Sequence, residues 1–228
     1  MRAERGNVGT MVRVAGITAL ILSIFPLFQL SAQHVSIGPQ IAFGDYREVS
    51  SDLHYTGGGI GAQATLEWKK FSANVVLTKV KYKPATGAAA TTAFDASELD
   101  VRLRYYIAGP VSGELGFINR KADPEFEAQS VGAVTAGARM AYLLGPGVRM
   151  ALRGGLMLGA KYSGGGTTSG VGALQLGLGL TVDALKGRLR VTGDYGFQRF
   201  SRQTDDGSGA LPAPIQQSLG RIGFAIAF

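Results

Sequence analysis

Hydrophobic and polar residues alternate with a period of two along most of the chain after about residue 33. The clearest case is Gly59–Lys69 (GIGAQATLEWK), where the apolar positions are Ile60, Ala62, Ala64, Leu66 and Trp68. The residues between them are small or polar. An amphipathic helix would instead repeat its apolar positions at intervals of three and four residues. The pattern therefore predicts a β-strand with one apolar face.

The same alternation recurs in nine further segments, so that ten strands are predicted. These segments are Val35–Phe43, Phe71–Tyr82, Leu99–Ile107, Val111–Arg120, Val134–Tyr142, Val148–Leu158, Leu174–Val182, Leu189–Phe197 and Gln216–Phe228. The alternating segments are 9 to 13 residues long, and most of the predicted strands extend a little beyond them, to about 10 to 14 residues. Strands of ordinary globular proteins have a mode of about 5 to 6 residues. A tilted strand that crosses a membrane needs about 9 to 11 residues. The length of the strands therefore favours a membrane barrel over a soluble sandwich.

The predicted connections alternate between short and long. Short ones lie at Lys69-Lys70, Gly109-Pro110, Gly145–Gly147 and Ala184–Gly187, and long ones at Tyr46–Thr56, Lys83–Ser97, Lys121–Ser130, Ser163–Gly170 and Ser201–Ile215. Short periplasmic turns and longer extracellular loops are typical of outer-membrane barrels. The sequence thus predicts an all-β fold: a closed antiparallel up-and-down transmembrane β-barrel of about ten strands, with eight as the alternative.

In a membrane barrel the apolar face of each strand meets lipid and the polar face lines the lumen. Aromatic residues near the strand ends are interpreted as two interfacial girdles. One would consist of Trp68, Phe71, Tyr142 and Phe228 near the short turns, and the other of Tyr46, Tyr55, Tyr82, Tyr162 and Phe200 near the long loops.

The segment Phe71–Lys83 leaves two interpretations open. If its phase is constant, Lys79, Lys81 and Lys83 lie on the outer rim, where they would meet anionic lipid phosphates. If a bulge near Thr78 shifts the phase, these lysines turn inward instead.

The polar face predicts a charged lumen in which basic residues outnumber acidic ones. Its predicted lining residues are Glu67, Asp100, Arg102, Arg104, Glu114, Arg139, Arg149, Arg153, Asp183, Arg188, Arg190, Asp194 and Arg221, and Lys69, Arg120 and Lys161 fall on the same face. Charges in a narrow interior must be paired or hydrated. Two interpretations follow: an ion-pair network that fills the lumen, or a narrow pore that prefers anions.

The composition excludes several other classes of function. The chain has 228 residues, no cysteine and a net charge of +7, with its basic residues spread singly along the strands. Disulfides and thiolate metal sites are excluded, and the charge pattern does not favour nucleic-acid binding. The acidic stretches ADPEFE (122–127) and DDGSG (205–209) lack the carboxylate spacing of calcium loops. We therefore expect no metal and no cofactor.

The first 32 residues differ from the rest. Arg2, Arg5 and Arg13 precede the apolar stretch VAGITALILSIFPLF, and small residues follow at Ser31-Ala32. This order is typical of a secretory signal peptide. We therefore expect a signal peptide at 1–32, with Met11 as an alternative start, and a barrel domain at 33–228. An uncleaved anchor helix is the other interpretation.

Candidate catalytic residues are few. The first long loop contains Asp45, Asp52 and His54, and the last contains Asp205-Asp206. Omptin proteases are also ten-stranded barrels with acidic residues and a histidine at the mouth, but the similarity is one of architecture alone, and no omptin motif is present. We therefore predict no catalytic residue and no enzyme. An omptin-like or lipid-modifying hydrolase remains as the last alternative.

The final octet, RIGFAIAF, resembles the assembly signal of bacterial outer-membrane proteins through Arg221, Gly223, Ile226 and Phe228. With the barrel pattern, the chain resembles the small porin-like and opacity-type outer-membrane barrels. This resemblance implies the bacterial cell outer membrane, contact with its lipid and lipopolysaccharide, and insertion by the barrel assembly machinery. It does not imply one activity. A monomeric structural or surface-interaction barrel is expected, and a narrow channel for small anionic solutes is the alternative.

Overall fold

The structure of the protein is a computed structural model of the 228-residue chain. It describes residues 33–51, 53–90, 92–123, 126, 130–162, 167–205 and 209–228. The chain separates into two units, Met1–Gln33 and His34–Phe228, and the fold described below belongs to the second. The predicted signal peptide, residues 1–32, lies outside the described residues.

Ten long antiparallel strands and one short strand make up most of the described chain, which confirms the predicted all-β fold. The bounds are β1 (Gln33–Glu48), β2 (Leu53–Trp68), β3 (Phe71–Pro84), β4 (Phe94–Ala108), β5 (Val111–Ala122), β6 (Val131–Gly145), β7 (Val148–Tyr162), β8 (Thr167–Ala184), β9 (Leu189–Asp205), β10 (Ala210–Pro212) and β11 (Ile215–Ala227). A short 3-10 turn, η3 (Leu185–Gly187), connects β8 to β9. Among the described residues, no helix is long and apolar enough to cross a membrane.

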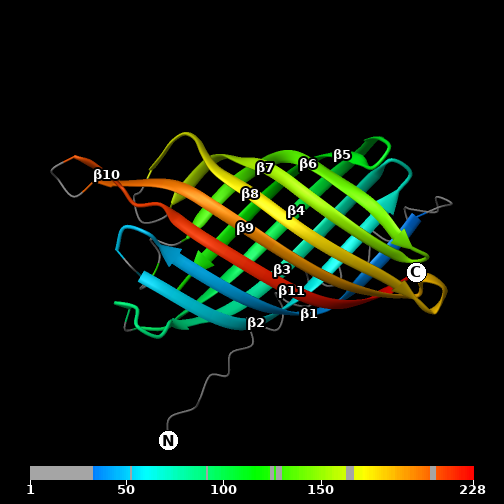
Figure 1. The fold of residues 1–228 in the computed structure, drawn as a ribbon, viewed down its shortest axis with the longest axis horizontal. Coiled ribbons are helices and arrows are strands. Elements are labelled where there is room, and N and C mark those ends of the chain that lie inside the picture. Colours follow the sequence, from blue (N-terminus) through cyan, green and yellow to red (C-terminus); the bar gives the residue numbers. More distant parts are fainter. Residues whose placement is uncertain are drawn as a thin grey trace, which may run out of the picture. The chain divides into compact units, whose positions relative to one another are not determined.

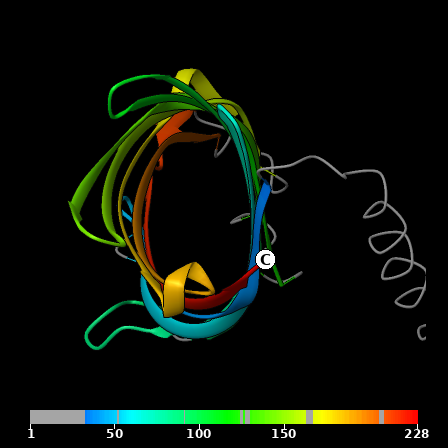
Figure 2. The same ribbon diagram turned by 90° about the vertical axis from the view of Figure 1, so that its right-hand side faces the viewer.

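The last strand closes the sheet into a barrel (Figure 2). On one side β11 pairs with β9, and on the other it pairs with β1, where Ile226 lies opposite Ile37. The backbone N–H of Phe228 donates a hydrogen bond to the carbonyl of Val35 over 2.9 Å. Because the first and last long strands pair with each other, neither leaves a free edge at which another chain can add a strand.

The two ends of the barrel differ in their connections (Figure 1). At one end, two-residue turns join β2 to β3 and β4 to β5, with Lys69 at a φ of 51° and Gly109 at a φ of 54°. Backbone in this left-handed region reverses a strand within two residues. We call this the short-turn end, and the opposite end, where β10 lies, the long-loop end.

The strands run further toward the long-loop end than the sequence predicted. The expected loop Tyr46–Thr56 is reduced to the four residues between Glu48 and Leu53. Likewise, β9 continues to Asp205 and pairs with β10 inside the expected loop Ser201–Ile215. Strands of 12 to 18 residues exceed what a membrane crossing needs. Their extra length extends the wall of the barrel beyond its apolar exterior.

Strand β3 shows where the exterior changes character. Near the short turns its outward side chains are apolar, including Phe71, Val75 and Leu77, and all three are exposed. Further along the same face lie Lys79, Lys81 and Lys83, which are also exposed. The pairing of β3 with β2 and β4 continues through this segment without a register shift. The phase is therefore constant, and the alternative with a bulge near Thr78 is wrong.

The same change occurs all around the barrel. Each long strand carries exposed apolar residues on its outer face near the short turns, among them Ile41, Ile60, Leu103, Leu115, Leu156, Leu178 and Phe224. Closer to the long loops, outward positions are basic in excess. We call this ring the collar, and its exposed basic members are Arg47, Lys79, Lys81, Lys83, Lys121, Lys161 and Arg199. An apolar exterior band bounded by polar residues is the surface of a transmembrane β-barrel.

Lys161 belongs to the collar because of a bulge in β7. The pairing of β7 shifts register with both neighbours around Gly159, whose φ is 59°. Met157 and Ala160 are consequently both buried, and Lys161 is exposed. The prediction that Lys161 faces the lumen is thus wrong, because one extra residue in a strand reverses every later side chain. Lys69 is also exposed, in its turn rather than along the lumen wall.

The predicted girdle near the long loops is also wrong. Tyr46, Tyr55, Tyr82 and Phe200 are buried inside the barrel and belong to one apolar cluster. The girdle near the short turns differs, since Trp68, Phe71, Tyr142 and Phe228 are all exposed. Where the wall extends beyond the apolar band, the barrel has a polar outside and an apolar inside, as a water-soluble protein has.

Candidate functional site

The interior of the barrel contains two zones. A network of ion pairs crosses the part nearer the short turns, where the exterior is apolar. An apolar core fills the part nearer the long loops, where the exterior is the collar. Each zone is built by strands far apart in the sequence, and each determines whether anything can pass through the lumen.

The network begins close to the short-turn end. Asp183 at the end of β8 accepts hydrogen bonds from Arg149 over 2.8 Å and from Arg190 over 2.7 Å. Arg190 also pairs with Glu67, at 3.1 Å between Nη1 and Oε1. These four residues come from β2, β7, β8 and β9. They form a chain of alternating charges along the inner wall near the short turns.

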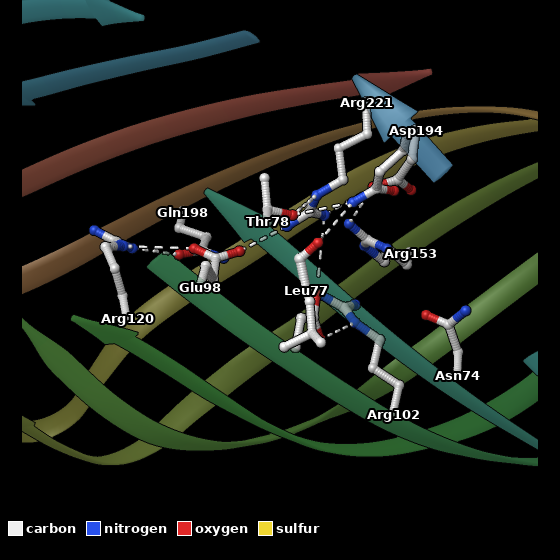
Figure 3. A network of polar contacts seen from close by, with 12 residues as sticks. Asn74, Leu77, Thr78, Glu98, Arg102, Arg120, Arg153, Asp194, Gln198 and Arg221 are labelled. Atoms are coloured by element: carbon white, nitrogen blue, oxygen red, sulfur yellow. Dashed lines mark hydrogen bonds and ion pairs between the residues drawn. The ribbon is translucent and has the colours of Figure 1, made fainter. Parts of the chain in front are cut away.

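Arg221 is the centre of the network (Figure 3). Its guanidinium lies 2.6 Å from Glu98, 3.5 Å from Asp194 and 4.0 Å from Asp100. It reaches these carboxylates from β11, while they belong to β4 and β9. Arg221 is 7% exposed, so its charge is compensated by protein carboxylates rather than by bulk water.

Two branches leave this centre. Toward β5, Asp100 accepts two hydrogen bonds of 2.7 Å from Arg102, whose Nη1 donates to Glu114 over 2.8 Å. Toward the long-loop end, Glu98 pairs with Arg120 at 3.4 Å. Buried ion pairs of this kind require well-formed hydrogen bonds on both sides to offset their desolvation. The bidentate contact between Arg102 and Asp100 has this geometry.

Small residues make room for these long side chains. Arg153, which lies 3.1 Å from Asp194, packs against Gly177 on the neighbouring strand. A Cβ atom at Gly177 would overlap the guanidinium of Arg153. Glycine on the polar face of this strand is thus a packing requirement of the network.

The apolar core lies around Phe94, which is 2% exposed. Its ring centroid lies 4.7 Å from that of Phe126, 5.0 Å from those of Tyr55 and Tyr82, and 5.9 Å from that of Tyr46. Edge-to-face and offset stacking at these distances is favourable beyond simple burial. The other large buried members include Ile118, Val131, Met157, Tyr162, Phe200 and Ile215.

The two zones are joined by arginines that contact both. Arg120 pairs with Glu98, and its guanidinium carbon lies 5.7 Å from the ring centroid of Phe200. Arg202 pairs with Glu48 at 3.2 Å and lies 5.6 Å from the ring centroid of Tyr162. Such cation–π contacts allow a charged group to border an apolar core.

Most of the predicted lining residues fall within this network. Those with ion pairs are Glu67, Asp100, Arg102, Arg104, Glu114, Arg149, Arg153, Asp183, Arg190, Asp194 and Arg221. Arg139 lines the same lumen but has no ion pair within 4 Å among the described residues. Arg188 lies exposed beyond η3, at the mouth.

The sequence interpretation missed Glu48, Glu98 and Arg202. Glu48 and Arg202 lie within segments expected to be loops, and Glu98 lies at the boundary of another. Glu98 could have been found from the alternation of its strand. It lies two residues before Asp100 and four before Arg102, so all three share one face.

The residues of the predicted assembly motif lie on different faces of β11. Arg221 faces the lumen, and Ile226 and Phe228 are exposed on the outer face. Gly223 lies where a Cβ atom would overlap the amide of Gln63. The spacing of the motif thus coincides with the lumen and lipid faces of β11.

One acid–histidine pair lies outside the lumen. His54 Nε2 is 2.7 Å from Asp45 Oδ2, and His54 Nδ1 is 3.4 Å from Arg47. Asp45 and Arg47 lie on the outward face of β1, opposite to the buried Tyr46. The predicted neighbours Asp52 and Asp206 lie outside the described residues. In the described part of the chain, no group of three or more potential metal ligands is found.

No family model matches the chain, and no curated protein matches it in sequence. Among solved structures, Neisserial surface protein A (NspA) aligns with a TM-score of 0.43 and 11% identity over 85% of this chain and 97% of its own. The outer membrane protease OmpT from Escherichia coli gives 0.47 and 7% over 88% and 98%. The translocator domain of the autotransporter NalP from Neisseria meningitidis gives 0.42 and 13% over 96% and 98%.

These likenesses concern the fold alone, and no activity is transferred from them. The closed antiparallel barrel, its apolar exterior and its charged lumen are those of a small bacterial outer-membrane β-barrel protein.

Proposed function

We propose that this protein is a non-enzymatic barrel of the bacterial outer membrane that conducts no solute, with its short turns in the periplasm and its long loops outside the cell. The observation that carries this proposal is the obstruction of the lumen by two successive layers. The ion-pair network around Arg221 crosses the interior. Beyond it, the apolar core around Phe94 fills the long-loop end.

Each layer would have to open for an ion to pass. The network contains residues from β4, β5, β9 and β11, and its central arginine is held by three carboxylates. The core consists mainly of apolar and aromatic side chains, and an ion entering it would lose most of its hydration. A barrel closed in this way acts through its exterior, as a structural element of the membrane or as a scaffold for its loops.

Single-channel recording in planar lipid bilayers tests this function. The purified, refolded barrel is expected to give no discrete conductance steps, because neither layer provides a continuous aqueous path. Bilayers without protein are the negative control, and a general porin reconstituted in the same way is the positive control. Reproducible steps with anion selectivity would contradict the closed barrel and establish the narrow channel instead.

We also propose that the collar contacts phosphates of lipopolysaccharide. Lys79 and Lys121 border an outward groove of about 450 Å³ whose other lining residues include Ile60, Leu77 and Leu99. Apolar residues below a pair of lysines fit a lipid whose acyl chains lie under a phosphate. Near a membrane surface each such basic residue contributes about 1 kcal/mol to the attraction of anionic lipid.

Lipopolysaccharide is therefore expected to raise the thermal unfolding midpoint of the wild-type barrel more than that of a Lys79→Gln/Lys121→Gln variant. The matched control is Lys70→Gln/Lys186→Gln, which removes two exposed lysines at the short-turn end. Equal stabilisation of all three proteins would refute the assignment of these lysines.

The pair formed by Asp45 and His54 is interpreted as a surface ion pair, because it lies outside the lumen and away from its cavity. Peptide and lipid hydrolysis assays give a direct check of this interpretation. An activity that is present in the wild-type protein and absent from His54→Ala would refute the non-enzymatic function.

A further inference from the structure

The short-turn half of the lumen contains a cavity of about 180 Å³. It is lined by residues of the ion-pair network, and a second hollow of about 560 Å³ at the short-turn mouth shares Glu67, Arg149 and Arg190 with it. The cavity is therefore approached from the short-turn mouth. On its other side lie Arg221 and the apolar core, so it has no continuation toward the long loops.

The charges that line this cavity do not balance. The charged residues of the lining are seven arginines and three carboxylates. Three further carboxylates, Glu98, Glu114 and Asp183, pair with these arginines from outside the lining, and Glu98 is also shared with Arg120. With Arg120 counted, eight arginines share these six carboxylates, so positive charge exceeds negative charge by two in this part of the lumen.

Among the arginines that line the cavity, Arg139 is the one without a carboxylate partner in the described residues. The other six lining arginines have carboxylate partners within 4 Å, and Arg139 has none among the described residues. Its direct partner across the β6–β7 ladder is another arginine, Arg153, on the same face. Like charges in directly opposed positions are destabilising. Nearby, the buried Nε of Arg104 lies 3.3 Å from Oε2 of Glu114, but neither atom makes a hydrogen bond.

We propose that this cavity is a binding site for a small oxyanion of the phosphate class, held chiefly by Arg139 and Arg104. A bound oxyanion would neutralise Arg139, screen its charge from that of Arg153 and accept a hydrogen bond from Arg104, whose Nε–H makes none with Glu114. The planar donor groups of arginine suit the oxygens of phosphate. A volume of about 180 Å³ accommodates one such anion with a few waters, since a water occupies about 30 Å³.

The site goes beyond the proposed function, because it requires only access from one end. In the orientation proposed above, this end opens to the periplasm. The barrel would then bind an anion in a blind cavity without transporting it. A failure of anion binding would leave the closed barrel unaffected, and conductance would leave the binding site unaffected.

Isothermal titration calorimetry of the refolded full-length barrel with inorganic phosphate, at constant ionic strength, tests the site. Saturable binding is expected in the wild-type protein, and chloride at the same ionic strength should not reproduce it. Arg139→Gln should weaken the affinity about tenfold or more, because a hydrogen bond to a charged group is lost together with the charge. The matched control is Arg199→Gln, which removes an exposed arginine of the collar and should bind like the wild type.

A second measurement separates binding from folding. Without phosphate, Arg139→Gln should be at least as stable toward denaturant as the wild type, since it removes an uncompensated charge from the lumen. A clear loss of stability would show that Arg139 is already satisfied within the barrel, and would overturn the proposal. Absence of saturable phosphate binding, or equal affinity of the Arg139→Gln variant, would do the same.

Discussion

Replacement of Arg221 by alanine is expected to lower the free energy of unfolding of the barrel by about 3 to 5 kcal/mol. The side chain is buried and lies within 4 Å of Glu98, Asp100 and Asp194. Its removal would leave three buried carboxylates with fewer compensating positive charges. Removing one partner of a buried ion pair is strongly destabilising, because the remaining charge is no longer compensated. Urea unfolding of the refolded barrel in lipid vesicles measures this change, and Trp68 provides the only tryptophan signal.

Two controls make this result specific. Arg199→Ala removes an exposed arginine from β9 and should change the free energy of unfolding by well under 1 kcal/mol. Because Arg221 also belongs to the predicted C-terminal assembly motif, refolding in vitro without assembly factors isolates its contribution to stability. If Arg221→Ala unfolds at the wild-type urea concentration under these conditions, the network around Arg221 does not stabilise the barrel.

Replacement of Phe94 by alanine is expected to cost about 3 to 5 kcal/mol. Phe94 is almost fully buried and has four aromatic neighbours inside the long-loop end. Truncation would leave a cavity among rigid rings that cannot collapse around it. Urea unfolding gives the loss of stability. Hydrogen exchange should locate it at the long-loop ends of β1 to β4, where the aromatic neighbours lie.

The matched control is Phe117→Ala on β5, an exposed residue of the apolar exterior. Lipid chains can occupy the space left by the Phe117 ring, so we expect a clearly smaller loss of stability in vesicles. Equal losses for the two variants would mean that the Phe94 ring contributes no more to stability than a residue on the exterior. Such a result would contradict the apolar core.

The architecture was predictable because it depends on a local pattern. Alternation with a period of two indicates which residues share a face of a strand. Long strands joined by alternately short and long connections indicate a membrane barrel. Gly59–Lys69 shows this relation, since Ile60 and Trp68 are exposed on the outside and Glu67 between them pairs with Arg190 in the lumen. Most of the predicted charged lining follows from the same rule, applied strand by strand.

The chemistry of each face was not predictable from alternation alone. Val76 and Leu77 alternate along β3 as regularly as Lys81 and Tyr82. In both pairs the buried residue, Val76 or Tyr82, is largely apolar. The exposed residue is apolar in the first pair (Leu77) and charged in the second (Lys81). What differs is the outer face of the wall, which changes from apolar side chains to lysines along β3. Sequence reasoning that assumes lipid along the whole strand therefore assigned Tyr82 to a girdle. The bulge at Gly159, which reverses Lys161, was likewise invisible in the pattern.

The sequence by itself determined the all-β fold, the ten long strands and the charged character of the lumen, because these depend on the order of residues within each strand. Only the tertiary structure decided which charges neutralise one another, as Arg221 does for carboxylates on β4 and β9. It also decided that Arg139 has Arg153 rather than a carboxylate opposite it. The physical reason is that the electrostatic energy of a lumen depends on distances between strands, and the register of a closed barrel sets these distances.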